Sequence, residues 1–387
     1  MDKKTISKIP FGQLGIIVHD SCREMGDKID QYIVERREKE FHKSSSKYYL
    51  EQLQDSYIIK SETARFANGE GKGILKESIR GKDLYVLADI GNYDIKYNLF
   101  GVETRMGPDE IFQDIKRLIS AVAGKARRIS VIMPMLYSGR QDKRNTRESL
   151  DCAMALQELE NLGVENIFTF DAHEPRVQNA IPLIGFESLH STYEIIKTMV
   201  NTEEDLQVDK SRLLVISPDT GAMDRAIYYA SVMGLDVGLF YKRRDYKKIV
   251  NGKNPIIQHE YIGSEVEGKD VLIVDDMIAS GESVFDIAKE LKKRNARNIY
   301  VAVSFALFTE GLDKMNSYYQ NGLIKKLFST NLTYIPDKIK EAEWFKEVDM
   351  SYLISLLIDV LNYDDSVSPL LDATEKIKEL FKKSPSN

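Results

Sequence analysis

The stretch VLIVDDMIASGESV, residues 271–284, combines paired carboxylates with a turn of small residues. Asp275 and Asp276 follow four apolar residues, and Ser280 and Ser283 lie where a helical pattern begins. In parallel α/β sheets ligands bind beyond the carboxyl ends of the strands, and the first turn of a helix binds phosphate through its N–H groups. A phosphorylated sugar would satisfy both features, with its phosphate at the turn and its diol at the carboxylates. The alternative is an acidic strand end followed by an ordinary helix cap.

A second stretch, YSGRQDKRNTRES (137–149), is dense in positive charge and follows another apolar run. Two carboxylates, Asp142 and Glu148, cannot pair with all of its cations, which are Arg140, Lys143, Arg144 and Arg147. Guanidinium groups bind phosphate oxygens in a bidentate manner, so the stretch is a candidate polyphosphate site. A solvated basic loop is the alternative interpretation.

Three further polar groups follow apolar runs. DAHEPRVQ (171–178) contains His173, and SPDTGAMDRA (217–226) contains Asp219 before a second possible phosphate-binding turn. YKRRDYKK (241–248) opens a polar loop with several cations, which could close over a phosphoryl group during its transfer. A helix cap at Asp219 and a basic surface loop at 241–248 are the competing interpretations.

Apolar runs and amphipathic stretches alternate along most of the chain, which predicts an α/β fold with mainly parallel sheets. We expect strands at 15–20, 84–90, 129–136, 166–173, 213–219, 236–241, 270–276 and 299–307. We expect helices at 109–124, 221–234 and 283–296, and a helical end to the chain from about 331. The polar segment 201–211 separates two series of alternating strands and helices that are similar in order. We therefore expect two stacked domains, 1–190 and 191–387. The polar segment 33–60 is expected to be an inserted helix and loop in the first domain. Its charge indicates a solvated face first and a surface for a partner second.

The composition excludes several classes of protein. With 387 residues, 29% of them charged and a net charge of −6, the chain differs from a dedicated nucleic-acid binder, which is usually basic. Two cysteines without a CxxC pair argue against a zinc site or a disulfide framework. No segment has the apolar length of a membrane span or a signal peptide. We therefore expect a cytoplasmic protein that binds neither membranes nor nucleic acid.

Taken together, the motifs resemble those of the ribose-phosphate pyrophosphokinases, which have the phosphoribosyltransferase fold. The order RFANGE (65–70), GRQD, DAH, SPDTG, YKRR and VDDMIASGES carries this resemblance. It implies two stacked phosphoribosyltransferase-like domains, and transfer of the diphosphoryl group of ATP to the C1 hydroxyl of ribose 5-phosphate, with Mg²⁺ as cofactor. It also implies a homo-oligomer in which adenine contacts cross between subunits.

The resemblance implies a role for each matching residue. ATP is expected to contact Phe66, Asn68, Gly69, Glu70, Arg140, Gln141 and His173. Ribose 5-phosphate is expected to contact Asp275, Asp276, Ala279, Ser280, Gly281, Glu282 and Ser283. Lys242 and Arg244 are the expected catalytic residues, and His173 and Asp219 are the expected metal ligands.

The chain departs from the usual motifs of that family at Asn68, Ala222, Ala279 and Glu282. Glu282 would lie beside the sugar phosphate, so we expect its carboxylate to point to solvent while its N–H faces the phosphate. Two other functions stay open: a phosphoribosyltransferase that acts on a base, and a non-catalytic homologue that binds nucleotides or regulates an active enzyme. The histidines outside DAH, which are His19, His42, His190 and His259, are expected to be surface or packing residues.

Overall fold

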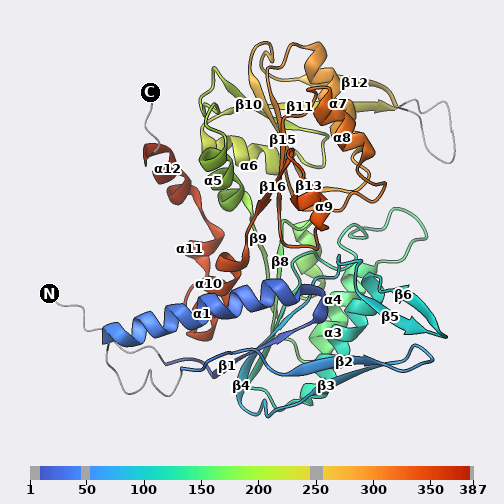
Figure 1. Ribbon diagram of the computed structural model, residues 1–387, viewed down its shortest axis with the longest axis vertical. Helices are drawn as coiled ribbons and strands as arrows, with labels where there is room; N and C mark the ends of the chain where they lie inside the picture. The colour runs from blue at the N-terminus through green and yellow to red at the C-terminus, as the bar shows by residue number, and fades with distance from the viewer. Residues whose placement is uncertain (1–8, 45–52, 245–255, 384–387) are drawn as a thin grey trace. The chain divides into compact units, whose positions relative to one another are not determined.

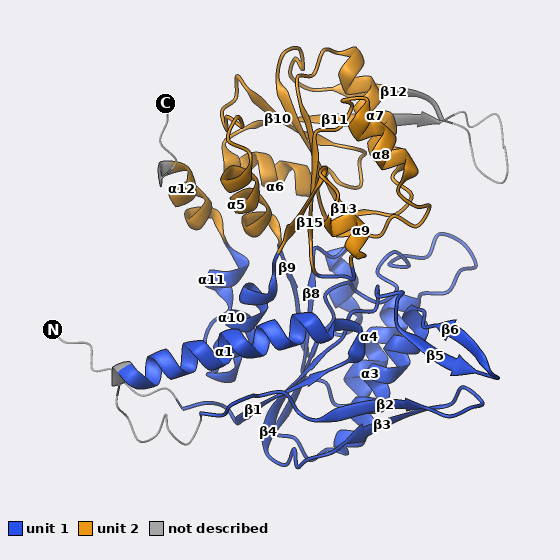
Figure 2. Cartoon of the chain, in the orientation of Figure 1, with its two compact units in different colours: residues 1–190, 332–334, 349–372 blue, residues 191–331, 335–348, 373–387 orange. Residues whose placement is uncertain are grey.

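A computed structural model describes residues 9–44, 53–244 and 256–383, and the side chains of 9–42, 53–241 and 260–381. The chain divides into two compact units (Figure 2). The first comprises Met1–His190, Leu332–Tyr334 and Asp349–Asp372, and the second comprises Ser191–Asn331, Ile335–Val348 and Ala373–Asn387. Part of the C-terminal region therefore belongs to the first unit. The division into domains at 1–190 and 191–387 stays a prediction.

The first unit is built on a five-stranded sheet in the order β1-β4-β7-β8-β9, with every pair parallel (Figure 1). Its strands are β1 (Gln13–Val18), β4 (Lys82–Leu87), β7 (Arg128–Ile132), β8 (Asn166–Phe170) and β9 (Gly185–Leu189). Apolar residues of α3 (Pro108–Val122) and α4 (Asp151–Asn161) form one core with the sheet. Elsewhere in the unit, α1 (Arg23–Ser44) packs against α10 (Ser351–Asn362).

Two antiparallel hairpins extend from the first unit. One joins β2 (Ser61–Arg65) to β3 (Gly71–Leu75), and the other joins β5 (Lys96–Leu99) to β6 (Val102–Arg105). The turn of the first hairpin contains most of the RFANGE motif. Short helical segments complete the unit: η1 (Asp20–Cys22), η2 (Pro175–Ala180) and α11 (Ser368–Leu371).

The second unit is built on a seven-stranded sheet in the order β12-β11-β10-β13-β14-β15-β16, in which only the β11–β12 pair is antiparallel. Its strands are β10 (Leu213–Ser217), β11 (Asp236–Arg244), β12 (Ile256–Ile262), β13 (Asp270–Ile278), β14 (Ile299–Ala306), β15 (Lys326–Thr330) and β16 (Phe345–Val348). Its helices are α5 (Thr192–Thr202), α6 (Met223–Met233), α7 (Glu282–Lys293), α8 (Asp313–Gln320), α9 (Asp337–Lys340) and α12 (Thr374–Lys383).

The eight strands and three helices that the apolar patterns predict are present, and both sheets are mainly parallel, so the prediction of an α/β fold is confirmed. One other prediction needs correction. The end of the chain is not entirely helical, because β16 adds an edge strand to the second sheet. Within the segment 33–60, α1 continues to Ser44, so the segment begins as a helix. That the segment is an insertion stays a prediction.

The charged side chains of α1 do not all face solvent. Arg36 and Arg37 both bind the Asp359 carboxylate of α10, and Arg37 is buried with only 2% of its side chain exposed. Arg37 also donates to the Asn362 Oδ1 at 2.8 Å, and its guanidinium lies over the ring of Tyr57. These two arginines therefore attach α1 to α10, because a buried guanidinium requires a carboxylate partner.

Candidate active site

Three neighbouring strands of the second unit carry predicted motifs at their carboxyl ends. In the sheet order β11-β10-β13, the strands are parallel, with Ser217 opposite Leu239 and Ile216 opposite Ile273. YKRR ends β11, SPDTG follows β10, and the acidic pair lies near the end of β13. The fold thus brings these three motifs to one edge of one sheet, where parallel α/β proteins bind ligands.

Asp275 and Asp276 lie inside β13 rather than after it, because the strand continues to Ile278. The Asp276 N–H donates to the Asp275 Oδ1, and the Met277 N–H donates to the Asp276 Oδ1, each at 2.8 Å. Burial raises the pKa of Asp275, and the neighbouring charge of Asp276 raises it further, while Arg225 of α6 acts in the opposite direction. The Arg225 guanidinium lies 3.9 Å from the Asp275 Oδ1. Arg225 therefore offsets part of the negative charge that Asp275 and Asp276 concentrate at this edge.

The turn after β13 requires glycine at position 281. Gly281 has a φ of 81°, and a Cβ atom there would lie 2.5 Å from the ring of Phe285. Helix α7 begins at Glu282, directly after this residue, so its first N–H groups border the turn. Ser280 and Ser283 are half-buried, whereas Glu282 is exposed. The turn has the form of an anion-binding helix start, and the expected orientation of Glu282 toward a bound phosphate stays a prediction.

Asp219 caps the turn that leads into α6. Its Oδ1 accepts from the N–H of Gly221 at 2.9 Å and from the N–H of Ala222 at 3.3 Å. One carboxylate oxygen therefore has the structural role that the helix-cap interpretation describes. Lys242 and Arg244 are residues of β11, and in the antiparallel pairing of strands Lys242 lies opposite His259 of β12. Their side chains, the side chain of His259 and residues 245–255 lie outside the part of the chain that the structure describes.

In the first unit, the GRQD loop follows β7. Arg140, Arg144 and Arg147 are exposed, and within the described part of the chain none of them forms an ion pair. The Lys143 Nζ lies 4.0 Å from the Asp142 Oδ2. The excess of cations that the sequence predicts is therefore present. The Gln141 side chain donates to the Ser149 carbonyl at 2.9 Å, so it also holds the loop together.

The DAH motif follows β8, the parallel neighbour of β7, so the fold places it at the same sheet edge as GRQD. His173 is exposed. Asp171 is buried, and its Oδ1 lies 3.1 Å from the His190 Nδ1, so His190 is one partner of this carboxylate. A hydrogen bond from Arg176 is the main reason that the pKa of Glu174 falls to about 2, and Lys143 of the GRQD loop contributes to the shift. The two loops are thus close enough to interact electrostatically.

The RFANGE turn has its own contacts. The Phe66 N–H donates to the Glu70 carbonyl at 2.8 Å, which closes the turn, and Gly69 has a φ of 91°. The Asn68 side chain donates to the Glu70 carboxylate at 3.1 Å and accepts from the Glu70 N–H at 3.2 Å. An ionised aspartate could not donate a hydrogen bond to the Glu70 carboxylate. Asparagine at position 68 can therefore make both hydrogen bonds within the turn. The ring of Phe66 is 54% exposed.

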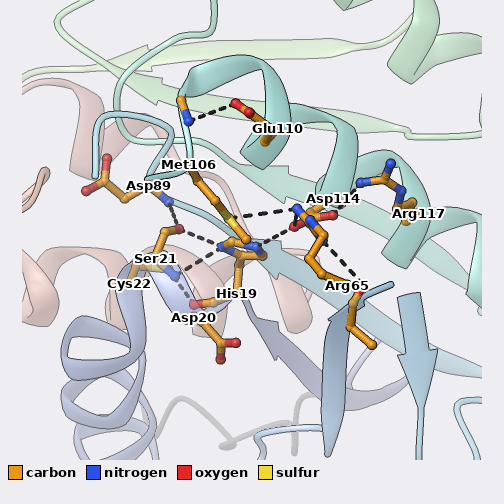
Figure 3. Close-up of polar contacts among 12 residues, drawn as sticks. His19, Asp20, Ser21, Cys22, Arg65, Asp89, Met106, Glu110, Asp114 and Arg117 are labelled. Atoms are coloured by element: carbon orange, nitrogen blue, oxygen red, sulfur yellow. Dashed lines mark hydrogen bonds and ion pairs between the residues drawn. The ribbon is translucent and has the colours of Figure 1, made fainter. Parts of the chain in front are cut away.

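A buried polar network anchors this turn at its base (Figure 3). Arg65, the residue before Phe66, donates to the Asp114 Oδ2 of α3 at 2.6 Å, and Arg117 donates to the Oδ1 at 2.7 Å. The His19 Nε2 lies 3.3 Å from the Asp114 Oδ2, and its Nδ1 lies 2.9 Å from the Ser21 Oγ. Burial would raise the pKa of Asp114, but the bonds from His19, Arg65 and Arg117 hold it at about 2.

The sequence did not indicate Arg225, this network or the β5–β6 hairpin. Nothing in the pattern around Arg225 marks it as a neighbour of Asp275. The hairpin did have a signal, since KYNLFGVETR alternates polar and apolar residues around Phe100-Gly101. Among the described residues, no three His, Cys, Asp or Glu side chains are grouped to hold a metal. No described helix combines the length and the apolar character that crossing a bilayer needs.

Comparisons with known proteins agree with this arrangement. Residues 14–163 match the model of the N-terminal domain of ribose phosphate pyrophosphokinase, and residues 186–332 match that of the phosphoribosyl transferase domain. The phosphoribosylpyrophosphate synthetase of Mycobacterium smegmatis has the same fold, with a TM-score of 0.69 and 19% identity over 90% of this chain and 98% of its own. The structure is thus a two-domain protein of the phosphoribosyltransferase-like class.

Similar curated sequences define the family more narrowly. Ribose-phosphate pyrophosphokinase of Mycoplasma genitalium is 28% identical over 335 residues, which cover 85% of this chain and 92% of that protein. Ribose-phosphate pyrophosphokinase 1 of Candida albicans is 24% identical over 314 residues, which cover 81% of this chain and 89% of that protein. The chain belongs to the ribose-phosphate pyrophosphokinase family.

Proposed function

We propose that this chain transfers the β,γ-diphosphoryl group of ATP to the C1 hydroxyl of ribose 5-phosphate, which gives phosphoribosyl pyrophosphate and AMP for nucleotide biosynthesis. The observation that supports this most strongly is the edge formed by β11, β10 and β13, where an acidic pair precedes a glycine-dependent helix start. That edge offers hydrogen-bond acceptors for a diol and donors for a phosphate. The exposed arginines of the GRQD loop, which form no ion pair with any described residue, offer the charge that a triphosphate requires.

Each predicted residue has a proposed role. Asp275 and Asp276 hold the ribose hydroxyls, and the turn from Ala279 to Ser283 holds the 5-phosphate. Phe66, Asn68, Gly69 and Glu70 contact adenine, while Arg140, Gln141 and His173 contact the ATP phosphates. Lys242 and Arg244 stabilise the diphosphoryl group as its charge spreads during transfer. Catalysis then comes mostly from positioning and charge neutralisation.

The residues fit Mg²⁺ that arrives with ATP better than a metal held by the protein alone. Mg²⁺ usually keeps several waters and binds one or two carboxylates together with substrate phosphates. The lack of a preformed ligand group among the described residues agrees with that mode of binding. Asp219, through its carboxylate, and His173 are the proposed contacts. When bound, the metal would neutralise charge on the triphosphate.

We also propose a homo-oligomer in the cytoplasm. The RFANGE turn contacts the β5–β6 hairpin, whereas the GRQD loop interacts with the DAH loop. The resemblance to ribose-phosphate pyrophosphokinases supports an arrangement in which one subunit's RFANGE turn reaches the nucleotide of another. Sedimentation of the purified protein at several concentrations tests the oligomer.

One incubation tests the function against its two alternatives. The purified protein is mixed with Mg-ATP and ribose 5-phosphate, and AMP and phosphoribosyl pyrophosphate are quantified. Equal amounts of both products support the proposal. ATP binding without turnover would indicate a regulatory homologue instead. Consumption of phosphoribosyl pyrophosphate with a purine or pyrimidine base, without use of ATP, would indicate a base phosphoribosyltransferase.

A further inference from the structure

The loop of the β5–β6 hairpin contains an aromatic residue in a strained backbone conformation. Phe100 and Gly101 form the two-residue loop between Leu99 and Val102. Both loop residues have positive φ values, 49° and 79°. Such loops favour asparagine, aspartate or glycine, because a β-carbon is strained in the left-handed region. Phe100 is nevertheless 81% exposed, so packing within the described fold does not compensate this strain.

The position of this loop suggests what the ring contacts. The Phe100 N–H donates to the Ala67 carbonyl oxygen, with 3.4 Å between nitrogen and oxygen, and a β-carbon on Gly69 would lie 2.8 Å from the Leu99 Cδ1. The tips of the two hairpins therefore touch, and they lie side by side in Figure 1. Two exposed aromatic rings, Phe66 at 54% and Phe100 at 81%, belong to these joined tips.

We propose that Phe100 is a second contact for the purine base of the nucleotide, beside Phe66 and from a different hairpin. This inference rests on the proposed function, because it assumes that RFANGE binds adenine. Aromatic rings stack on bases through their faces, and such stacking depends on ring area more than on hydrogen bonding. The base would lie against the ring of Phe100 while Asn68 and Glu70 contact its polar edge.

The network below the hairpins supports a fixed platform. Arg65, at the base of the RFANGE turn, lies with its guanidinium 5.5 Å from the ring centroid of Tyr97 in β5. The same guanidinium binds Asp114, whose side chain is fully buried. One cation therefore couples both hairpins to α3, so their tips present the two rings in a defined arrangement before any nucleotide binds. Prearranged groups lose less conformational freedom on binding.

The test compares ATP with tripolyphosphate, which keeps the phosphate chain but lacks the ribose and the base. In calorimetric titrations with Mg²⁺ present, Phe100→Ala should weaken ATP binding by about tenfold, within the range for loss of one base–aromatic stack. Binding of tripolyphosphate, which has no base, should stay unchanged. Phe100→Tyr should restore ATP binding, since it keeps the ring. The control is Leu183→Ala, which removes another highly exposed apolar side chain of the first unit, 89% exposed.

Two results would overturn the inference. Unchanged ATP binding by Phe100→Ala would exclude a base contact, and a simultaneous change in sedimentation would assign Phe100 to a contact between copies of the chain. Equal weakening of ATP and tripolyphosphate binding would assign the effect to the phosphate site. These titrations measure binding and need no turnover. They therefore test the inference even if the wild-type protein forms no AMP, which would refute the proposed function but not the base contact.

Discussion

In the second unit the chemically distinctive carboxylates belong to a buried strand, whereas in the first unit the distinctive cations lie on exposed loops. Asp276 is 4% exposed within β13, while Arg140, Arg144 and Arg147 are exposed after β7. Burial makes the acidic pair electrostatically costly in the absence of a ligand, because each charge loses water and opposes the other. The exposed arginines carry no such cost. We therefore expect mutations of the acidic pair to change both stability and binding, and mutations of the arginines to change binding alone.

The largest effect is expected for Asp275→Asn. Loss of charge-assisted hydrogen bonds to ribose should lower kcat/KM for ribose 5-phosphate by about 10²–10³-fold, at about 1.5–3 kcal/mol per bond. The free protein should become more stable at pH 8, because one of two neighbouring buried charges is removed. Product formation and chemical denaturation measure the two effects. A loss of activity with a parallel loss of stability would contradict this account.

The pH dependence of this group has a definite sign. The folded state raises the pKa of Asp275, so the folded protein binds this proton more tightly than the unfolded chain. Stability from this group is therefore present at low pH and is lost as pH rises from about 4, the usual value for aspartate, through the raised pKa. The Asp275→Asn variant should lack this part of the pH dependence.

The next effect is expected for Asp114→Asn in the buried network. Removing the charge leaves Arg65 and Arg117 without their carboxylate partner, so the free energy of unfolding at pH 7 should fall by about 3 kcal/mol. ATP binding should weaken as well, since Arg65 anchors the RFANGE turn. Asp109→Asn on the same helix is the control, because Asp109 makes one exposed hydrogen bond, to Tyr137.

Acid denaturation sharpens this test. The pKa of Asp114 is lowered to about 2, so its contribution is present above about pH 4 and is lost as pH falls through about 2. The difference in stability between wild type and Asp114→Asn should therefore shrink over that interval. A difference that stays constant down to pH 2 would show that the carboxylate charge has no part in it.

A smaller loss is expected for Gly281→Ala. The new β-carbon would be strained at a φ of 81° and would meet Phe285, so unfolding free energy should fall by about 2 kcal/mol. KM for ribose 5-phosphate should rise. Gly322→Ala is the matched control, because it has a φ of 67° with no atom within 4 Å of the added carbon. Equal losses in both variants would mean that Phe285 can move aside freely.

The smallest effect is expected for Arg140→Ala. Removing one phosphate contact should raise KM for ATP by about tenfold, which corresponds to about 1.4 kcal/mol. The unfolding midpoint should not change, because Arg140 is exposed and forms no ion pair within the described part of the chain. Arg80→Ala, at another exposed arginine of the same unit, is the control for loss of charge. A similar rise in KM for both variants would indicate a general electrostatic effect.

The parallel strands were predictable because burial on both faces leaves a continuous apolar run, as in ISVIMPML and DVLIVDD. The expectation at Asp275 and Asp276 followed from their place at the end of such a run. Strands β2 and β3 escaped prediction because SETAR and GKGIL are short and mostly half-exposed, so neither has a strong apolar pattern. Edge strand β16, with the sequence FKEV, has the same weakness.

Contacts between distant side chains could not be predicted. Asp114 appears in the sequence as one polar residue within an amphipathic helix, and only the fold brings Arg65 and His19 to it. The charged segment that contains Arg36 and Arg37 looked solvated because its partner, Asp359, lies more than 300 positions later. Local composition shows charge, whereas the choice between a buried pair and a solvated one depends on tertiary structure.

The central claim is that this chain transfers the β,γ-diphosphoryl group of ATP to ribose 5-phosphate. Incubation with ribose 5-phosphate, Mg²⁺ and ATP labelled at the γ-phosphorus follows that group directly. We expect the label in phosphoribosyl pyrophosphate, with one AMP formed for each labelled product. Label in inorganic phosphate accompanied by ADP, or label that stays in ATP, would contradict the account.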